Sequence, residues 1–227
     1  MPEQLSFQLP SVTALGRADF LVAPSNAIAV AMIENWHDWT SRKLVLCGPE
    51  GAGKTHLTHV WASQSGAEIV SAKALKDAGI PALAHRCIAV EDISDIAGDL
   101  AAQTALFHLH NLVLAEGHTL LMTGTGAPAH WGLDLPDLAS RIIGTQAVII
   151  DAPDDALLSA VIAKLLADRQ LTPKADLIPY LTSRIDRSFS AARDIVAQLD
   201  TASLSLKRAM TRQLAASVLD KQKTAAR

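Results

Sequence analysis

The feature that most constrains this chain is an apolar run that leads into a glycine-rich turn and then into a helical pattern. The run covers residues 44–47, and after it come Gly48, four further residues and then Gly53-Lys54-Thr55. Glycines allow a tight turn whose N–H groups point inward, and a helix that begins near Lys54 adds the positive end of its dipole. The segment therefore predicts a pocket for phosphate oxygens. The alternative is a glycine-rich turn without a ligand.

Each residue of this loop has an expected role. Lys54 reaches the β- and γ-phosphates of a nucleotide, and the Thr55 hydroxyl binds Mg²⁺. The sequence thus predicts ATP or ADP, together with Mg²⁺, as ligands. The expected nucleotide-binding residues of the loop are Gly48, Pro49, Glu50, Gly51, Ala52, Gly53, Lys54, Thr55 and His56.

Strand-like and helical patterns alternate through the first two thirds of the chain. The expected strands are residues 44–47, 68–71, 86–90, 119–123 and 147–150, and they are mostly continuous apolar runs, as in a parallel sheet covered on both faces. Helical spacing is clearest in residues 54–64 and 100–116. Beyond residue 150 only helical patterns remain, at 153–169, 176–184, 190–201 and 204–219. We predict an α/β fold with a five-stranded parallel sheet and a small C-terminal all-helical subdomain.

The domain boundaries follow from the same patterns. Residues 1–12 are expected to form an extended arm, 13–152 the α/β subdomain and 153–227 the helical subdomain. The arm is rich in large apolar side chains, so it either packs on its own domain or docks on a partner. Only about 26 residues follow Thr201, too few for an independent DNA-binding domain.

Charge and cysteine content limit the classes of function. A net charge of −3 and a pI near 6.2 argue against a protein whose whole surface binds nucleic acid. Cys47 and Cys87 lie in apolar runs, as core residues of a reducing compartment do, and no leader or membrane-spanning run is evident, so we expect a cytoplasmic protein. The C-terminal stretch is basic, which fits a solvated helix face or a nucleic-acid contact; its charged residues are Lys207, Arg208, Arg212, Lys221, Lys223 and Arg227, with Asp220.

Two acidic residues follow the third expected strand. Glu91 is expected to help to hold Mg²⁺ opposite Thr55, and Asp92 occupies the place of an acid that orients the attacking water. Asp is usual at the first position, and the longer Glu alters the Mg²⁺ geometry. The alternative is that both residues cap the next helix.

The motifs in this order resemble the AAA+ core of the replication initiator DnaA, and more closely the Hda-type regulatory inactivators of DnaA within that family. The resemblance covers nearly the whole chain. It is carried by residues 23–26 (Ala-Pro-Ser-Asn), 53–57 (Gly-Lys-Thr-His-Leu), 91–93 (Glu-Asp-Ile), 132–141 (Gly-Leu-Asp-Leu-Pro-Asp-Leu-Ala-Ser-Arg), 185–187 (Ile-Asp-Arg) and 198–200 (Gln-Leu-Asp).

The resemblance implies further site residues. Arg141 matches an arginine finger that acts in trans on the nucleotide of a neighbouring subunit, whereas by itself it is also an ordinary exposed Arg at a helix end. Ser190 stands where such proteins place a sensor arginine, with Arg187 and Arg193 nearby, and Thr125 follows the fourth strand without the acid common there. The residues that would line the adenine pocket are Phe20, Pro24, Ser25 and Asn26.

The arm also resembles a family motif, the short peptide that binds the DNA polymerase sliding clamp. The matching residues are Gln4, Leu5, Ser6, Phe7 and Leu9, and Gln8 replaces a frequent proline. The resemblance implies a nucleotide-binding regulator of replication initiation that docks on the clamp and stimulates ATP hydrolysis on DnaA. A self-sufficient AAA+ ATPase, such as a helicase loader or remodelling factor, is the alternative, and a small-molecule kinase is a third reading that the apolar C-terminal helices disfavour.

Overall fold

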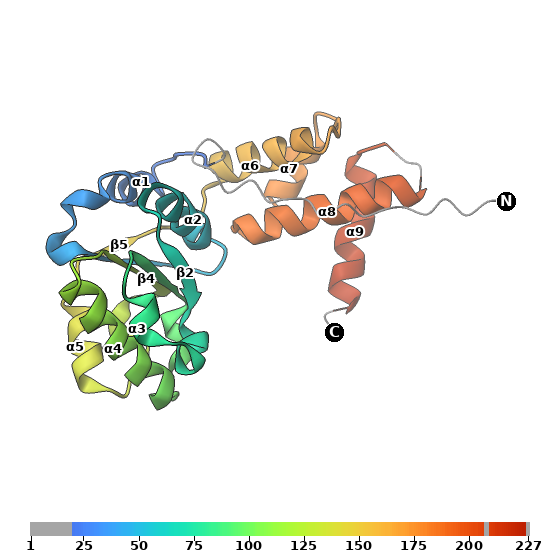
Figure 1. Ribbon diagram of the computed structural model, residues 1–227. Helices are drawn as coiled ribbons and strands as arrows, with labels where there is room; N and C mark the ends of the chain where they lie inside the picture. Colours follow the sequence, from blue (N-terminus) through green and yellow to red (C-terminus); the bar gives the residue numbers. More distant parts are fainter. Residues whose placement is uncertain (1–19, 207–208, 226–227) are drawn as a thin grey trace, which may run out of the picture.

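The computed structural model describes residues 20–206 and 209–225 (Figure 1). The predicted clamp-binding residues of the arm therefore lie outside the described residues. In the α/β part the helices and strands are α1 (Ala27–Glu34), β1 (Lys43–Gly48), α2 (Lys54–Ser65), β2 (Glu68–Ser71), α3 (Ile80–Leu83), β3 (Ile88–Glu91), α4 (Leu100–Ala115), β4 (Leu120–Thr125), α5 (Pro136–Ile143) and β5 (Ala147–Ile149).

The five strands form one all-parallel sheet in the order β2-β3-β4-β1-β5. This confirms the predicted sheet. Because β1 is an interior strand, between β4 and β5, the carboxyl end that leads into the glycine-rich loop lies between two neighbouring strand ends. Gly48 pairs in register with Thr125 of β4, and Cys47 pairs with Ile149 of β5.

Successive residues of β1 point to opposite faces of the sheet and enter two separate cores. Leu44 and Leu46 join the cluster that α1 and α2 cover, whereas Val45 and Cys47 join the cluster that α3, α4 and α5 cover. Figure 1 shows these two helix layers on either side of the sheet. Burial on both faces explains why the strand reads as an unbroken apolar run.

Three of the four tryptophans pack together, one on α2 and two just after α1. Trp39 stacks on Trp61 with ring centroids 5.4 Å apart, and Trp36 meets Trp61 edge-on at 6.2 Å. The Trp39 Nε1–H donates to the Met32 carbonyl at 2.7 Å, which fixes the chain where α1 has ended. Helix α1 stops at Glu34, and a 3₁₀ turn, Trp36–Asp38, follows it.

The C-terminal subdomain consists of α6 (Asp155–Asp168), α7 (Leu177–Thr182), α8 (Phe189–Leu206) and α9 (Arg212–Ala225), packed around a third core. The Asp154 carboxylate starts α6 by accepting from the Leu157 N–H at 2.7 Å. The last two expected helices differ at their junction, because α8 continues to Leu206 and α9 begins only at Arg212. Among the described residues no helix is long and apolar enough to cross a membrane.

Candidate nucleotide site

The glycine-rich loop has a backbone that only glycine adopts without cost. Gly51 and Gly53 have φ angles of +71° and +103°, in the left-handed region that strains other residues. Gly48 has an ordinary φ, but a Cβ there would lie 2.5 Å from the Ile150 carbonyl oxygen. Gly48 is therefore required because its backbone lies close to the Ile150 carbonyl, whereas Gly51 and Gly53 are required because of their left-handed backbone conformation.

Lys54 begins α2 and is folded inward under the loop. Its Nζ donates to the carbonyl oxygens of Gly48 and Pro49, each at 2.9 Å, and the side chain is buried. Burial lowers the pKa of Lys54, and the charge of Asp92 opposes this most strongly. The ammonium group thus sits where phosphate oxygens entering the loop would replace the two carbonyls as its partners.

Thr55 and Glu91 lie together at the carboxyl end of the sheet, as the sequence predicts for a Mg²⁺ site. Burial raises the pKa of Glu91, and a hydrogen bond from the Thr55 hydroxyl partly offsets the shift. The Oε1 atom of Glu91 is buried and has no partner among the described residues. An unpartnered carboxylate oxygen next to an exposed threonine hydroxyl fits Mg²⁺, which takes one or two protein oxygens and the phosphates of a nucleotide.

The described part of the chain contains no group of three or more His, Cys, Asp or Glu side chains able to hold an ion by themselves. Cys47 lies next to the loop, but burial raises its pKa to about 11 and keeps the thiol protonated. This residue is therefore a core side chain, as expected.

Asp92 leaves β3 in a left-handed conformation, with φ of 59°, and is exposed. Its N–H donates to the Thr123 hydroxyl at 3.2 Å, which ties the end of β3 to that of β4. Its side chain makes no capping hydrogen bond to the 3₁₀ helix Ile93–Ile96 that follows. The cap alternative thus has no support at Asp92.

The helical subdomain closes over the loop through the start of α8. The Phe189 N–H donates to the Gly51 carbonyl at 2.8 Å, and a Cβ on Gly51 would lie 2.5 Å from the Ser190 Oγ. Ser188 and Ser190 share a hydrogen bond at 3.1 Å. Two hydroxyls therefore face the loop where the resemblance expects an arginine.

Of the two nearby arginines, neither is directed to this place by an interaction in the structure. Arg187 pairs with Asp155 of α6 at 3.0 Å, and Arg193 is exposed on α8. The family resemblance predicts a role for Ser190 but not for Ser188 or Phe189. Their only signal would have been proximity in sequence to Ser190.

Aromatic rings border the other side of the loop. The Phe20 ring is buried and meets the His56 ring edge-on, with centroids 5.0 Å apart. A Cβ on Gly53 would lie 3.1 Å from the Phe189 ring and 3.3 Å from the Phe20 ring. These three rings, from three separate segments, enclose the start of α2.

The remaining residues of the expected adenine pocket divide into two kinds. The Asn26 side chain accepts from the Ala23 N–H and donates to the Leu21 carbonyl, both at 2.9 Å, so it shapes its own turn. Ser25 has a buried Oγ with no partner among the described residues, and Pro24 is exposed. The Ser25 hydroxyl is thus a buried polar group of this turn that has no partner in the described structure.

Arg141 lies far from this loop, near the start of β1. It is exposed on α5, with its guanidinium carbon 5.0 Å from the centre of the Phe107 ring. Its charge lowers the pKa of two neighbours, Lys43 and His110. Lys43 is the first residue of β1 and Gly48 the last, so the two ends lie roughly 17 Å apart.

These elements define an AAA+ fold, a parallel P-loop sheet followed by a helical lid. The sequence matches no model of a known protein family. Structural similarity is extensive nonetheless. Domain III of the replication initiation protein DnaA from Thermotoga maritima superimposes with a TM-score of 0.79 at 17% identity, covering 91% of this chain and 96% of that one.

Two further structures extend the similarity. AMPPCP-bound DnaA from Aquifex aeolicus gives a TM-score of 0.68 at 17% identity, with 80% of this chain and 63% of that chain covered. The FIGL-1 AAA domain gives 0.67 at 16% identity, covering 90% and 82%. The five-stranded order and the helical lid thus belong to a fold shared by DnaA and other AAA+ proteins.

Proposed function

We propose that this protein is a nucleotide-binding AAA+ regulator of replication initiation of the Hda type. It binds ADP or ATP with Mg²⁺, docks on the sliding clamp through residues 4–9 and stimulates ATP hydrolysis on DnaA through Arg141. The observation that carries the proposal is the separation of two features. The phosphate loop is complete, while the exposed Arg141 lies at the opposite end of β1.

Nucleotide binding is supported by the chemistry of the loop. Lys54 is held below it, the N–H groups of α2 face the phosphate position, and Thr55 and Glu91 supply oxygens for the cation. Mg²⁺, when bound, neutralises charge on the phosphates. Structures of the same fold were obtained with AMPPCP, as in Aquifex aeolicus DnaA, and with ADP, as in the FIGL-1 AAA domain.

The positions of Ser190 and Arg141 support action on the nucleotide of a second molecule. Ser190 presents a hydroxyl to the loop instead of a guanidinium, so this position of the lid adds no positive charge. Arg141 is too far from that loop to serve it, and its exposed guanidinium is available to a second molecule. A guanidinium stabilises the charge that develops in phosphoryl transfer, an effect worth ~10³–10⁵ in rate.

The central test measures hydrolysis of ATP bound to DnaA in the presence of DNA-loaded clamp. Wild-type protein is expected to accelerate conversion to ADP, and Arg141→Ala to remove at least about 90% of the acceleration, because the transition-state charge loses its partner. Arg86→Ala removes another exposed arginine, one that pairs with Glu68, and serves as the control. Equal stimulation by wild type and Arg141→Ala would overturn the proposal.

Clamp docking has a separate test. Deletion of residues 1–9 is expected to abolish capture by immobilised clamp while leaving the thermal unfolding midpoint unchanged, as expected of an extended arm that docks on a partner. Retained capture would place the clamp contact elsewhere on the molecule.

A self-sufficient ATPase is the second candidate, and Asp92 favours it. This residue directly follows Glu91 and has an exposed carboxylate free of capping duties, as a water-orienting acid requires. The candidate predicts substantial turnover without DnaA that Asp92→Ala abolishes. Turnover that is negligible without DnaA would exclude it.

A further inference from the structure

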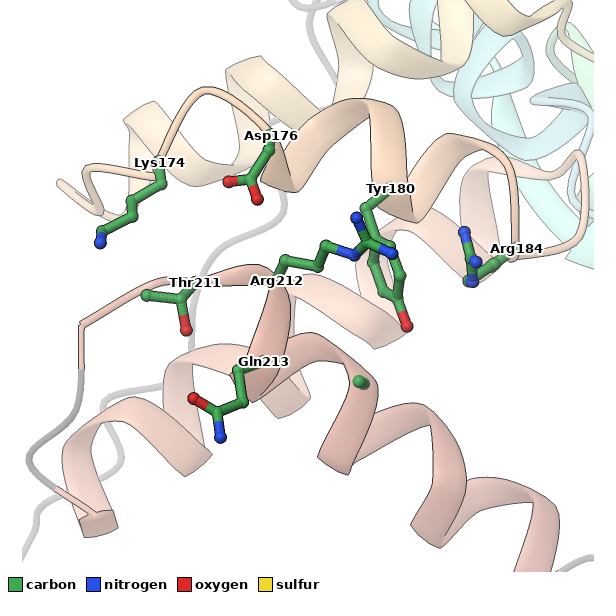
Figure 2. Close-up of a pocket in the computed structure, with 8 residues that line it drawn as sticks. Lys174, Asp176, Tyr180, Arg184, Thr211, Arg212 and Gln213 are labelled. Atoms are coloured by element: carbon green, nitrogen blue, oxygen red, sulfur yellow. The ribbon is translucent and has the colours of Figure 1, made fainter.

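The helical subdomain carries an open groove that the nucleotide site does not use. It has a volume of about 530 Å³ and lies between α7, the loop before it and the start of α9. Figure 2 shows Lys174 and Asp176 at one end, Arg184 at the other, and Arg212 across the Tyr180 ring between them. The lining residues are Lys174, Asp176, Tyr180, Arg184, Thr211, Arg212, Gln213 and Ala216.

Two guanidinium groups share one aromatic ring in this groove. The guanidinium carbons of Arg184 and Arg212 lie 4.0 and 4.9 Å from the centre of the Tyr180 ring. Such stacking fixes the planes of the arginines while their N–H groups stay open for further partners. In the described part of the chain neither arginine has an ion pair; Arg184 donates only to the Ser183 hydroxyl, at 3.0 Å.

The backbone adds to the positive character of the groove. Helix α9 begins here with Arg212, and Thr211 holds its first turn through a 3.3 Å hydrogen bond from the Leu214 N–H. The N-terminus of a helix repels cations and attracts anions. The lining contains three basic residues, the two arginines and Lys174, and one acidic residue, Asp176. The groove therefore carries a net positive charge that an anion would neutralise.

We propose that this groove binds the phosphate backbone of nucleic acid. Guanidinium forks together with the N–H groups of a helix N-terminus form the donor arrangement that phosphate oxygens accept. The groove is open rather than enclosed, so a continuing strand can pass through it. The groove contains neither Arg141 nor any residue of the phosphate loop or of the arm. Its test is therefore independent of the proposed function.

The experiment measures binding of labelled duplex and of single-stranded DNA of the same sequence by fluorescence anisotropy, across about 50–200 mM salt. Wild type is expected to bind at least one of the two forms. Arg184→Gln/Arg212→Gln should bind at least about ten-fold more weakly, with a salt slope smaller by about two. The control Arg86→Gln/Arg193→Gln removes two exposed arginines outside the groove and should bind as wild type.

A single substitution keeps the proposal testable if the Arg184→Gln/Arg212→Gln variant does not fold. Lys174 is exposed, and Lys174→Gln leaves the stacked arginines in place, so its salt slope should fall by about one with an unchanged unfolding midpoint. The proposal fails if wild type binds neither DNA form, or if the groove and control variants bind alike. It also fails if labelled polyglutamate binds more tightly than DNA and loses affinity in the groove variants, which would assign the groove to an acidic protein segment.

Discussion

At the scale of single residues, His110 is an imidazole kept neutral by its surroundings. It is 1% exposed, and its Nε2 lies 3.4 Å from the Lys43 ammonium. Burial lowers the pKa of His110 to about 4, with Lys43 and Arg141 adding to the shift and a contact with Asn111 opposing it. The folded protein thus resists a protonation that the unfolded chain accepts.

This shift predicts a loss of stability in mild acid. Between the ordinary pKa of 6.5 and the folded value of about 4, the unfolded state binds more protons, so the free energy of unfolding falls as the pH falls through this window. From pH 7.5 to pH 5 the contribution is about 2 kcal/mol. Urea unfolding at the two pH values should show it in wild type. His110→Gln should lack this part of the loss, and an equal loss in both proteins would contradict the assignment.

Glu91 gives a second prediction at this scale, in which stability and binding change in opposite directions. Burial raises its pKa, so a carboxylate at neutral pH is destabilising until a cation arrives. Glu91→Gln should therefore raise the unfolding midpoint of the nucleotide-free protein, and the gain should shrink in acid as the wild-type carboxyl becomes protonated. Affinity for Mg²⁺-nucleotide should fall about 10–100-fold. Calorimetry of both proteins with and without ligand checks this, and a lower midpoint would contradict it.

At the scale of elements, the contact between α8 and the phosphate loop links the lid to the nucleotide site. Gly51→Ala should cost about 1–2 kcal/mol for its left-handed backbone, and the new Cβ would also press on Ser188 and Ser190. We expect a larger loss of stability than this backbone cost and weaker nucleotide binding, both measurable by thermal shift with and without ADP.

Gly66 offers a matched control for this substitution. It has nearly the same backbone, with φ of +69°, but a Cβ there meets nothing within 4 Å. Gly66→Ala should therefore show the backbone cost alone and bind nucleotide as wild type. Equal behaviour of the two variants would mean that the lid contact contributes nothing to binding.

The elements also show what the sequence alone could and could not predict. All five strands were predictable because a parallel strand buried on both faces is an apolar run, as β1 is. Helix α5 was anticipated only through Arg141, as an Arg at a helix end, and its bounds were not predicted because the helix is short and begins at Pro136. The junction of α8 and α9 was misplaced because helical spacing continues across it and no glycine or proline marks the break.

In the nucleotide site and in the groove, too, local sequence patterns were predictable and contacts between distant residues were not. The phosphate loop is local in sequence, so its glycines, Lys54 and Thr55 could be named from spacing. Contacts of Phe189 with Gly51 and of Arg212 with Tyr180 join separate elements, and no local pattern encodes them. The contact of Arg184 with Tyr180 is local, since the two residues are four apart at the end of α7. Asn26 could be predicted as a residue of the pocket, but the hydrogen bonds of its side chain to the backbone of Ala23 and Leu21 could not.

At the scale of the whole molecule, the two subdomains have separate cores and meet at the loop. A nucleotide bound there contacts both, so it should stabilise them together. At a nucleotide concentration 100-fold above Kd the expected gain is about 2.7 kcal/mol, seen as one transition at a higher temperature. Lys54→Ala should remove the gain. Stabilisation of one transition while a second stays unchanged would show that the lid does not respond to the nucleotide.

The packing of Trp61 should allow nucleotide binding to be followed by intrinsic tryptophan fluorescence. Trp61 lies on α2, seven residues after Lys54 and so roughly 10 Å along the helix from the phosphate position. It is fully buried against Trp39 and Trp36, and its Nε1–H has no partner in the described part of the chain. A small shift of α2 on phosphate entry would change the overlap of these rings. The protein thus contains its own fluorophore for stopped-flow measurement of nucleotide exchange, without any attached label.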